Sequence, residues 1–212
     1  MQEPRIIFED PDIFVVSKPA GMASQSGRGM QMDLLNWLKN FRARRGEPPE
    51  VYLVHRLDQP VSGVMAYAKT KAAAADLSRQ LTDGRMKKIY EAEAAGSFAE
   101  KSGTLVDWLT EDGTANLCRV VPAGSKDAKR AELHYQVKAE RNGISLLEIT
   151  LLTGRRHQIR VQLAHAGHPV CGDLRYGTVP ADELKLRAVR LELILHGQHK
   201  SFEDSGAVPW KV

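Results

Sequence analysis

The sequence predicts a mixed α/β (α+β) fold, with a largely antiparallel sheet and flanking helices. Short apolar segments separated by hairpin-like turns recur along the 212 residues, and a few amphipathic helices lie between them. No glycine-rich phosphate loop follows the first predicted strand, which argues against a dinucleotide-binding fold. The length fits one large domain or two small ones, and we expect residues 1–212 to form a single domain.

The N-terminal part of the chain is expected to hold four strands and two helices. The strands are predicted at residues 5–8, 13–16, 51–54 and 63–68. Apolar residues at helical spacing predict a helix over residues 30–45, which Gly46 ends. An alanine-rich segment predicts a second helix over residues 71–83, with Thr70 as its N-cap and Gly84 after its end.

The remaining residues are expected to form mostly strands. These are predicted at residues 88–94, 105–109, 117–121, 130–139, 144–152 and 186–195. The segment 144–152 is the most apolar of them, so we expect it to be central in its sheet. A third helix is predicted over residues 156–166, ended by Gly167.

Composition indicates an ordinary soluble globular protein, because 42% of the residues are hydrophobic and 26% are charged. No apolar stretch approaches the roughly 20 residues that a membrane-spanning helix needs, and the N-terminus shows no secretory signal. Two cysteines, Cys118 and Cys171, suit a reducing compartment, so we expect a cytoplasmic protein.

The net charge of +4 is a modest excess, but the basic residues are clustered. The clusters are Lys39, Arg42, Arg44 and Arg45; Arg85, Lys87 and Lys88; Lys126, Lys129 and Arg130; and Arg155, Arg156 and Arg160. Lysine and arginine that neutralise phosphates release counterions, which produces salt-sensitive binding to nucleic acid. The alternative for each cluster is a solvated face of the protein.

The segment His55-Arg56-Leu57-Asp58-Gln59-Pro60-Val61-Ser62-Gly63 follows a short apolar run. A strand that ends in Arg-Leu-Asp and then turns sharply can present one carboxylate at the floor of a cleft, as a catalytic acid requires. The alternative is an aspartate that caps a turn, since such turns are common.

Besides residues 55–63, four further segments resemble parts of one protein family. They are Lys87-Lys88-Ile89-Tyr90, residues 151–169 with Thr153-Gly154-Arg155-Arg156-His157-Gln158-Ile159-Arg160, the opening residues 9–21, and residues 168–173. In this order and spacing, the five segments closely resemble the RluA family of RNA pseudouridine synthases over about residues 6 to 200. Many relatives carry a small RNA-binding domain ahead of the catalytic one. Because the motifs start within ten residues of Met1, we expect that domain to be absent.

The resemblance implies the pseudouridine synthase fold, with a central RNA-binding cleft, and an enzyme that isomerises a specific uridine in structured RNA. Ribosomal RNA is the favoured substrate, with transfer RNA or both as alternatives. The reaction needs no cofactor, and we expect no metal and a monomer. Three histidines, at positions 157, 165 and 168, lack the acid or cysteine that would complete a metal site.

Three catalytic residues follow from the resemblance: Asp58 as the carboxylate, Tyr90 as the aromatic that stacks on the uracil, and Arg160 as the partner that keeps Asp58 ionised. Their structural alternatives are a turn cap, a core tyrosine and an arginine on a helix surface.

RNA binding is assigned to five further residues. They are Arg56, which is expected to enter the RNA where the base departs, Lys88, Arg155, His157 and His55. Arg155 and His157 could instead support neighbouring catalytic groups, Lys88 could instead hold the local structure, and His55 could instead support the loop. The family has threonine where this chain has Val61, which bears on substrate choice rather than on activity.

Two other classes of function are possible. The first is an RNA-binding module that keeps the fold without activity. The second is a hydrolase or glycosidase with an aspartate nucleophile, which would need a second carboxylate or a metal that no motif supplies.

Overall fold

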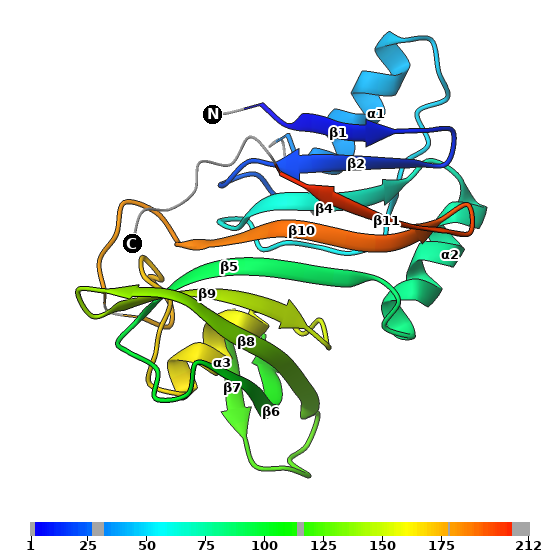
Figure 1. The fold of residues 1–212 in the computed structure, drawn as a ribbon. Helices are drawn as coiled ribbons and strands as arrows, with labels where there is room; N and C mark the ends of the chain where they lie inside the picture. The colour runs from blue at the N-terminus through cyan, green and yellow to red at the C-terminus, as the bar shows by residue number, and fades with distance from the viewer. Residues whose placement is uncertain (1–2, 27–31, 114–116, 178, 205–212) are drawn as a thin grey trace. The chain divides into compact units, whose positions relative to one another are not determined.

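The computed structural model describes residues 3–26, 32–113, 117–177 and 179–204 (Figure 1). These residues divide into two compact units. The first unit holds the residues up to Lys88 and those from Ala188 onward, and the second holds Ile89–Arg187. The single domain expected from the sequence therefore stays a prediction, and each unit is described by itself.

The first unit is built on antiparallel strands (Figure 1). Its strands are β1 (Arg5–Glu9), β2 (Ile13–Lys18), β3 (Tyr52–Leu53), β4 (Ser62–Ala68), most of β10 (Leu186–Leu195) and β11 (Gln198–Glu203). Their order is β1-β2-β4-β10, with β3 paired to β4 and β11 paired to β10. The strand expected over residues 51–54 is shorter than predicted, and β11 was not predicted.

Two capped helices complete the first unit. In α1 (Leu34–Arg44) the Asp33 carboxylate accepts a hydrogen bond from the Asn36 N–H at 2.7 Å. This cap explains why the helix begins later than the predicted residue 30; residues 30 and 31 lie outside the described part of the chain. In α2 (Lys71–Thr82) the Thr70 hydroxyl accepts from the Ala73 N–H at 3.1 Å, so the predicted cap is confirmed.

Successive side chains of β2 pack on opposite faces of the sheet. Ile13 and Val15 belong to a buried cluster that includes Leu77 of α2. On the opposite face Phe14 meets the ring of Phe41 in α1, with 6.2 Å between ring centroids. Each fully buried side chain of this size stabilises the fold by roughly 1.5–3 kcal/mol, so both helices are held by the same strand.

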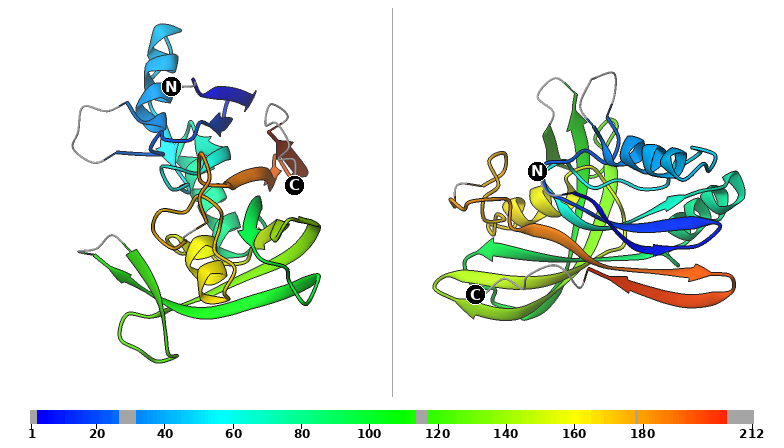
Figure 2. Two further views of the ribbon diagram at one scale, coloured as in Figure 1. Left: turned by 90° about the vertical axis from the view of Figure 1, so that its left-hand side faces the viewer. Right: turned by 90° about the horizontal axis from the view of Figure 1, so that it is seen from above.

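The second unit contains a second run of strands and the third helix (Figures 1 and 2). Its strands are most of β5 (Lys87–Ala95), β6 (Ser102–Asp112), β7 (Leu117–Val121), β8 (Lys129–Arg141) and β9 (Ile144–Leu151). The order is β5-β9-β8-β6-β7. The most apolar strand, β9, thus lies between two others, as predicted.

Helix α3 (Gln158–His165) packs its Val161 against a buried cluster formed with Leu109, Cys118 and Ala131 of β6, β7 and β8. The helix begins two residues later than predicted, because His157 has a left-handed backbone with φ of 52°. Gly167, with φ of 86°, follows its last turn as expected.

Candidate active site

Asp58 lies in the turn between β3 and β4, in the first unit. The side chains of the turn alternate: His55 and Leu57 are buried, Arg56 is exposed and Asp58 is half-buried. The turn is closed by a hydrogen bond from the Val61 N–H to the Asp58 carbonyl at 3.0 Å. Burial thus alternates along residues 55–58, with Arg56 and Asp58 the two more exposed side chains.

The buried hydroxyl of Ser24 holds the peptide group that precedes Asp58. It donates a hydrogen bond to the Leu57 carbonyl at 2.9 Å and accepts one from the Leu57 N–H at 3.1 Å. The Tyr67 hydroxyl in β4 donates to the Ser24 carbonyl at 2.8 Å. The backbone at Asp58 is therefore fixed by a serine that sequence analysis did not single out.

Lys18 supports the other side of the same turn. Its side chain has no exposed surface, and its Nζ donates to the carbonyls of Pro19 (3.0 Å), Met22 (2.6 Å) and Gln59 (3.2 Å). Three carbonyls match the three donors of an ammonium group. Burial lowers the pKa of Lys18 to about 7, against the opposing effect of the negative charge on Asp58. A buried lysine thus holds the backbone on this side of the candidate catalytic carboxylate.

His55 lies inside the first unit, where its Nε2 accepts a hydrogen bond from the Ala66 N–H of β4 at 3.1 Å. Burial, with a smaller contribution from the charge on Lys88, lowers its pKa to about 3. The ring is therefore neutral near pH 7 and faces away from solvent. This geometry favours support of the loop, the alternative considered for His55, over direct contact with RNA.

Strand β5 carries both Lys88 and Tyr90, two positions apart, so their side chains leave the same face of the strand. Tyr90 is buried, and burial lowers the pKa of Lys88. Both side chains are therefore largely shielded from solvent.

Arg160 of α3 is 4% exposed and forms a bidentate ion pair with Asp173 of the second unit. Its Nε reaches Oδ2 and its Nη2 reaches Oδ1, both at 2.7 Å. Burial alone would raise the pKa of Asp173, but hydrogen bonds from Arg160 and from the Arg175 N–H lower it. The alternative of a helix-surface arginine is therefore wrong. The predicted pairing of Arg160 with Asp58 joins the two units and stays a prediction.

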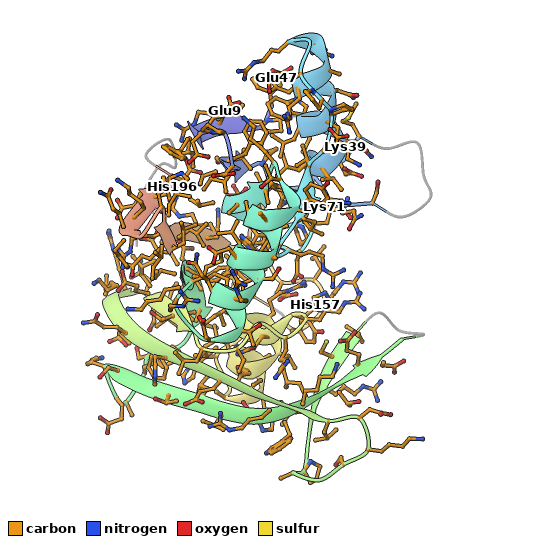
Figure 3. The ribbon with its side chains drawn as sticks, turned by 90° about the vertical axis from the view of Figure 1, so that its right-hand side faces the viewer. Glu9, Lys39, Glu47, Lys71, His157 and His196 are labelled. Carbon is orange, nitrogen blue, oxygen red and sulfur yellow. The ribbon has the colours of Figure 1, made fainter. Side chains whose placement is uncertain are left out.

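His157 precedes α3 and is buried (Figure 3). Its Nδ1 lies 2.8 Å from the Tyr176 hydroxyl, and the Arg160 guanidinium lies 5.2 Å from the centre of the Tyr176 ring. Tyr176 thus connects His157 and Arg160, which fits a supporting role for His157 better than a phosphate contact. No sequence signal beyond its nearness to Asp173 would have indicated Tyr176.

The segment before α3 is braced by its own side chains. The Gln158 Oε1 accepts from the Thr153 hydroxyl at 2.8 Å and from the Arg155 N–H at 2.9 Å. The exposed Arg155 donates through Nε to the Arg130 carbonyl at 2.9 Å. The predicted RNA contact at Arg155 therefore has an exposed side chain on a well-ordered loop.

Within the described residues, no three histidine, cysteine, aspartate or glutamate side chains gather as a metal site would require. No helix in the same part of the chain is long and apolar enough to cross a bilayer.

A family model described as RNA pseudouridylate synthase matches residues 12–165. An uncharacterised RNA pseudouridine synthase of Bacillus subtilis, YhcT, is 38% identical over 175 residues, covering 81% of this chain and 57% of that protein. Ribosomal large subunit pseudouridine synthase D of Nitrosomonas europaea is 38% identical over 186 residues, covering 87% of this chain and 53% of that one. The chain spans about half the length of these relatives.

Solved structures agree on the fold. Human RNA pseudouridylate synthase domain containing 4 superimposes with a TM-score of 0.79 at 22% identity, covering 95% of this chain and 88% of that one. Human RNA pseudouridylate synthase domain containing 1 has a TM-score of 0.77 at 25% identity, covering 95% and 83%. The expected pseudouridine synthase fold is thus confirmed.

Proposed function

Because the chain belongs to the RNA pseudouridylate synthase family, we propose that it isomerises a uridine of structured RNA to pseudouridine. The observation that supports this most is the Asp58 turn, where a half-buried carboxylate and an exposed arginine lie on backbone that Lys18 and Ser24 hold. Relatives named as ribosomal large subunit enzymes favour ribosomal RNA, with transfer RNA or both as alternatives.

The reaction conserves every atom of the nucleotide. The bond from the base nitrogen to the ribose breaks, the uracil turns, and the ribose bonds to C5 while the C5 proton is lost and a proton returns to the nitrogen. Asp58 is the carboxylate, whether it attacks the sugar, attacks the base or removes a proton from the ribose. In each of these versions Asp58 reacts as the carboxylate.

The other residues bind and orient the substrate. Tyr90 is proposed to stack on the uracil, and Arg160, whose direction Asp173 fixes, to stabilise the charge on Asp58. The exposed Arg56 is proposed to occupy the space that the extruded base leaves. Lys88 and Arg155 are proposed to bind phosphates of the RNA backbone. The protein is further proposed to be a cytoplasmic monomer that requires no metal or cofactor.

The first test is pseudouridine mapping by carbodiimide treatment and primer extension. Ribosomal and transfer RNA from cells that lack the protein would be compared with RNA after restoring wild type or Asp58→Asn. We expect a stop that disappears on deletion and returns only with wild type. Unchanged maps in both RNA classes would contradict the proposed activity on them.

The same variant separates the competing classes. Asp58→Asn is expected to bind RNA with wild-type affinity and to lose more than about a thousandfold in rate, because the carboxylate is the reacting group. An RNA-binding module would show equal binding and no product from either protein. A glycosidase would release free uracil, which chromatography detects.

A further inference from the structure

Leu174 is the most exposed large apolar side chain in the described part of the chain. It is 98% exposed, whereas Met32, Val106 and Leu152 are 47–52% exposed. Single exposed hydrophobic residues are common on protein surfaces, so exposure alone carries no argument. The fixed geometry of the turn that presents Leu174 is the basis for a binding role.

The Leu174 turn is held firmly from both sides. The Asp173 Oδ1 accepts from the N–H groups of Arg175 (2.9 Å) and Tyr176 (3.2 Å), and the Gly177 N–H donates to the Asp173 carbonyl at 3.0 Å. The Asp173 carboxylate also binds Arg160 of α3. Leu174 is thus exposed to solvent on a backbone that hydrogen bonds already fix. Binding through Leu174 would therefore cost little further conformational entropy.

Tyr176 ties this turn to two further segments. Its hydroxyl accepts from the Cys118 N–H of β7 at 2.7 Å and contacts the His157 ring at 2.8 Å. The Leu174 turn is therefore linked through Tyr176 to β7 and to the start of α3, and through Asp173 to the buried ion pair with Arg160.

Arginines adjoin these anchoring residues. Arg175 follows Leu174 and is exposed, Arg156 precedes His157, and Arg119 follows Cys118. Arg156 and Arg119 lie 3.7 and 3.2 Å from Glu111 and Asp112, and such exposed pairs are weak. An exposed apolar side chain followed directly by an exposed arginine matches RNA, which offers the faces of unpaired bases beside phosphates.

We propose that Leu174 packs against an unpaired nucleobase of the RNA substrate, next to phosphates bound by the neighbouring arginines. The proposal rests on the proposed function and deepens it, because the turn also holds Arg160 through Asp173. Apolar side chains such as leucine serve as wedges beside or between bases in other nucleic-acid complexes. Leu174 is therefore a specificity residue for RNA structure around the target uridine.

The test measures both binding and turnover of the full chain on an in vitro transcript of large-subunit ribosomal RNA. Leu174→Ser is expected to weaken binding and lower kcat/KM about tenfold, the change that corresponds to one lost base contact. Leu174→Met should remain within about twofold of wild type, because it keeps the apolar surface. The matched control is Val106→Ser, a half-exposed apolar residue on β6 of the same unit, which should also stay within about twofold.

Each outcome decides the proposal. Wild-type binding and turnover in Leu174→Ser would overturn it, as would an equal loss in Val106→Ser. If Leu174→Ser shows a lowered thermal unfolding midpoint, Leu174→Gln, which keeps the length of the side chain, replaces it in the same comparison. If wild type makes no pseudouridine in this transcript, the proposed activity on large-subunit ribosomal RNA fails, while the binding comparison still decides whether Leu174 contacts RNA.

Discussion

Lys18 shows how a single buried residue can fix the backbone beside a candidate catalytic carboxylate. Lysine is almost never fully buried, so its place in a Lys-Pro-x-Gly segment did not reveal that it lies in the interior. The structure explains its position by three carbonyl acceptors, one of them from Gln59, directly after Asp58. The turn that carries Asp58 could be predicted because the acid, the proline and the glycine are local in sequence.

Lys18→Met is expected to remove a pH dependence of stability. The pKa of Lys18 is about 7 in the folded protein and near 10.5 when unfolded, so the unfolded chain binds more protons between these values. Wild-type stability should therefore rise with pH from about 7 to 10.5, by up to several kcal/mol, relative to the variant. Denaturant unfolding at a series of pH values measures this, and a constant difference between the proteins would contradict it.

His55 should make the free energy of unfolding depend on pH in the acid range. Its pKa is about 3 when folded and 6.5 when unfolded, so the stability associated with the neutral ring is lost as the pH falls from 6.5 towards 3. His55→Gln keeps an oxygen acceptor for the Ala66 N–H but does not titrate. It should lose less stability than wild type over this range.

The exposed His199→Gln provides the matched control for His55, and its unfolding curve should follow that of wild type in acid. If both variants lose stability as wild type does, the acid sensitivity arises elsewhere in the molecule.

At the scale of elements, the predictions were accurate where the pattern is local. The Thr70 cap, the alanine-rich helix and the β2 and β4 strands could be identified because propensity, capping and apolar pattern agree. Strand β11 was missed because its residues are mostly polar and only Phe202 is buried. The start of α3 was placed too early, since a left-handed residue at His157 has no reliable signal in sequence.

Gly63 at the start of β4 is expected to tolerate no side chain. It has φ of 121°, and a Cβ there would lie 2.0 Å from the carbonyl oxygen of Ala188 in β10. Gly63→Ala should therefore lower the free energy of unfolding by more than about 3 kcal/mol.

Gly21 offers a matched control for Gly63. Its φ is 82° and a Cβ would meet nothing within 4 Å, so Gly21→Ala should cost only about 1–2 kcal/mol of backbone strain. Chemical denaturation of both variants tests the comparison, and equal losses would show that the close approach to Ala188 is relieved easily.

At the scale of the whole molecule, five motifs in one order predicted the fold, which two human structures bear out. The division into two compact units was not predicted, because it depends on packing between residues far apart in the chain. The Arg160–Asp173 pair was missed for a related reason: both residues stood in quoted segments, but only the structure shows that they meet.

The basic residues should make RNA binding strongly dependent on salt. Replacing one phosphate-binding arginine, Arg56→Gln or Arg155→Gln, is expected to reduce the slope of log affinity against log salt by about 1. Arg79→Gln provides a control, because Arg79 is an exposed arginine of α2 that lies outside the segments proposed to bind RNA. Filter binding at several salt concentrations measures the slopes, and an unchanged slope would remove that arginine from the interface.

The first unit closes its core with residues that the ribosome makes only after the whole second unit. Its apolar cluster joins Ile13, Val15 and Leu77 to Leu191, Leu193 and Leu195, although about a hundred residues of the other unit intervene. At 5–20 residues per second, synthesis leaves the early strands without these partners for about 5–20 s. The second unit, which is continuous in the chain, can therefore fold first during translation. The N-terminal strands are then the part of the nascent protein most in need of a chaperone.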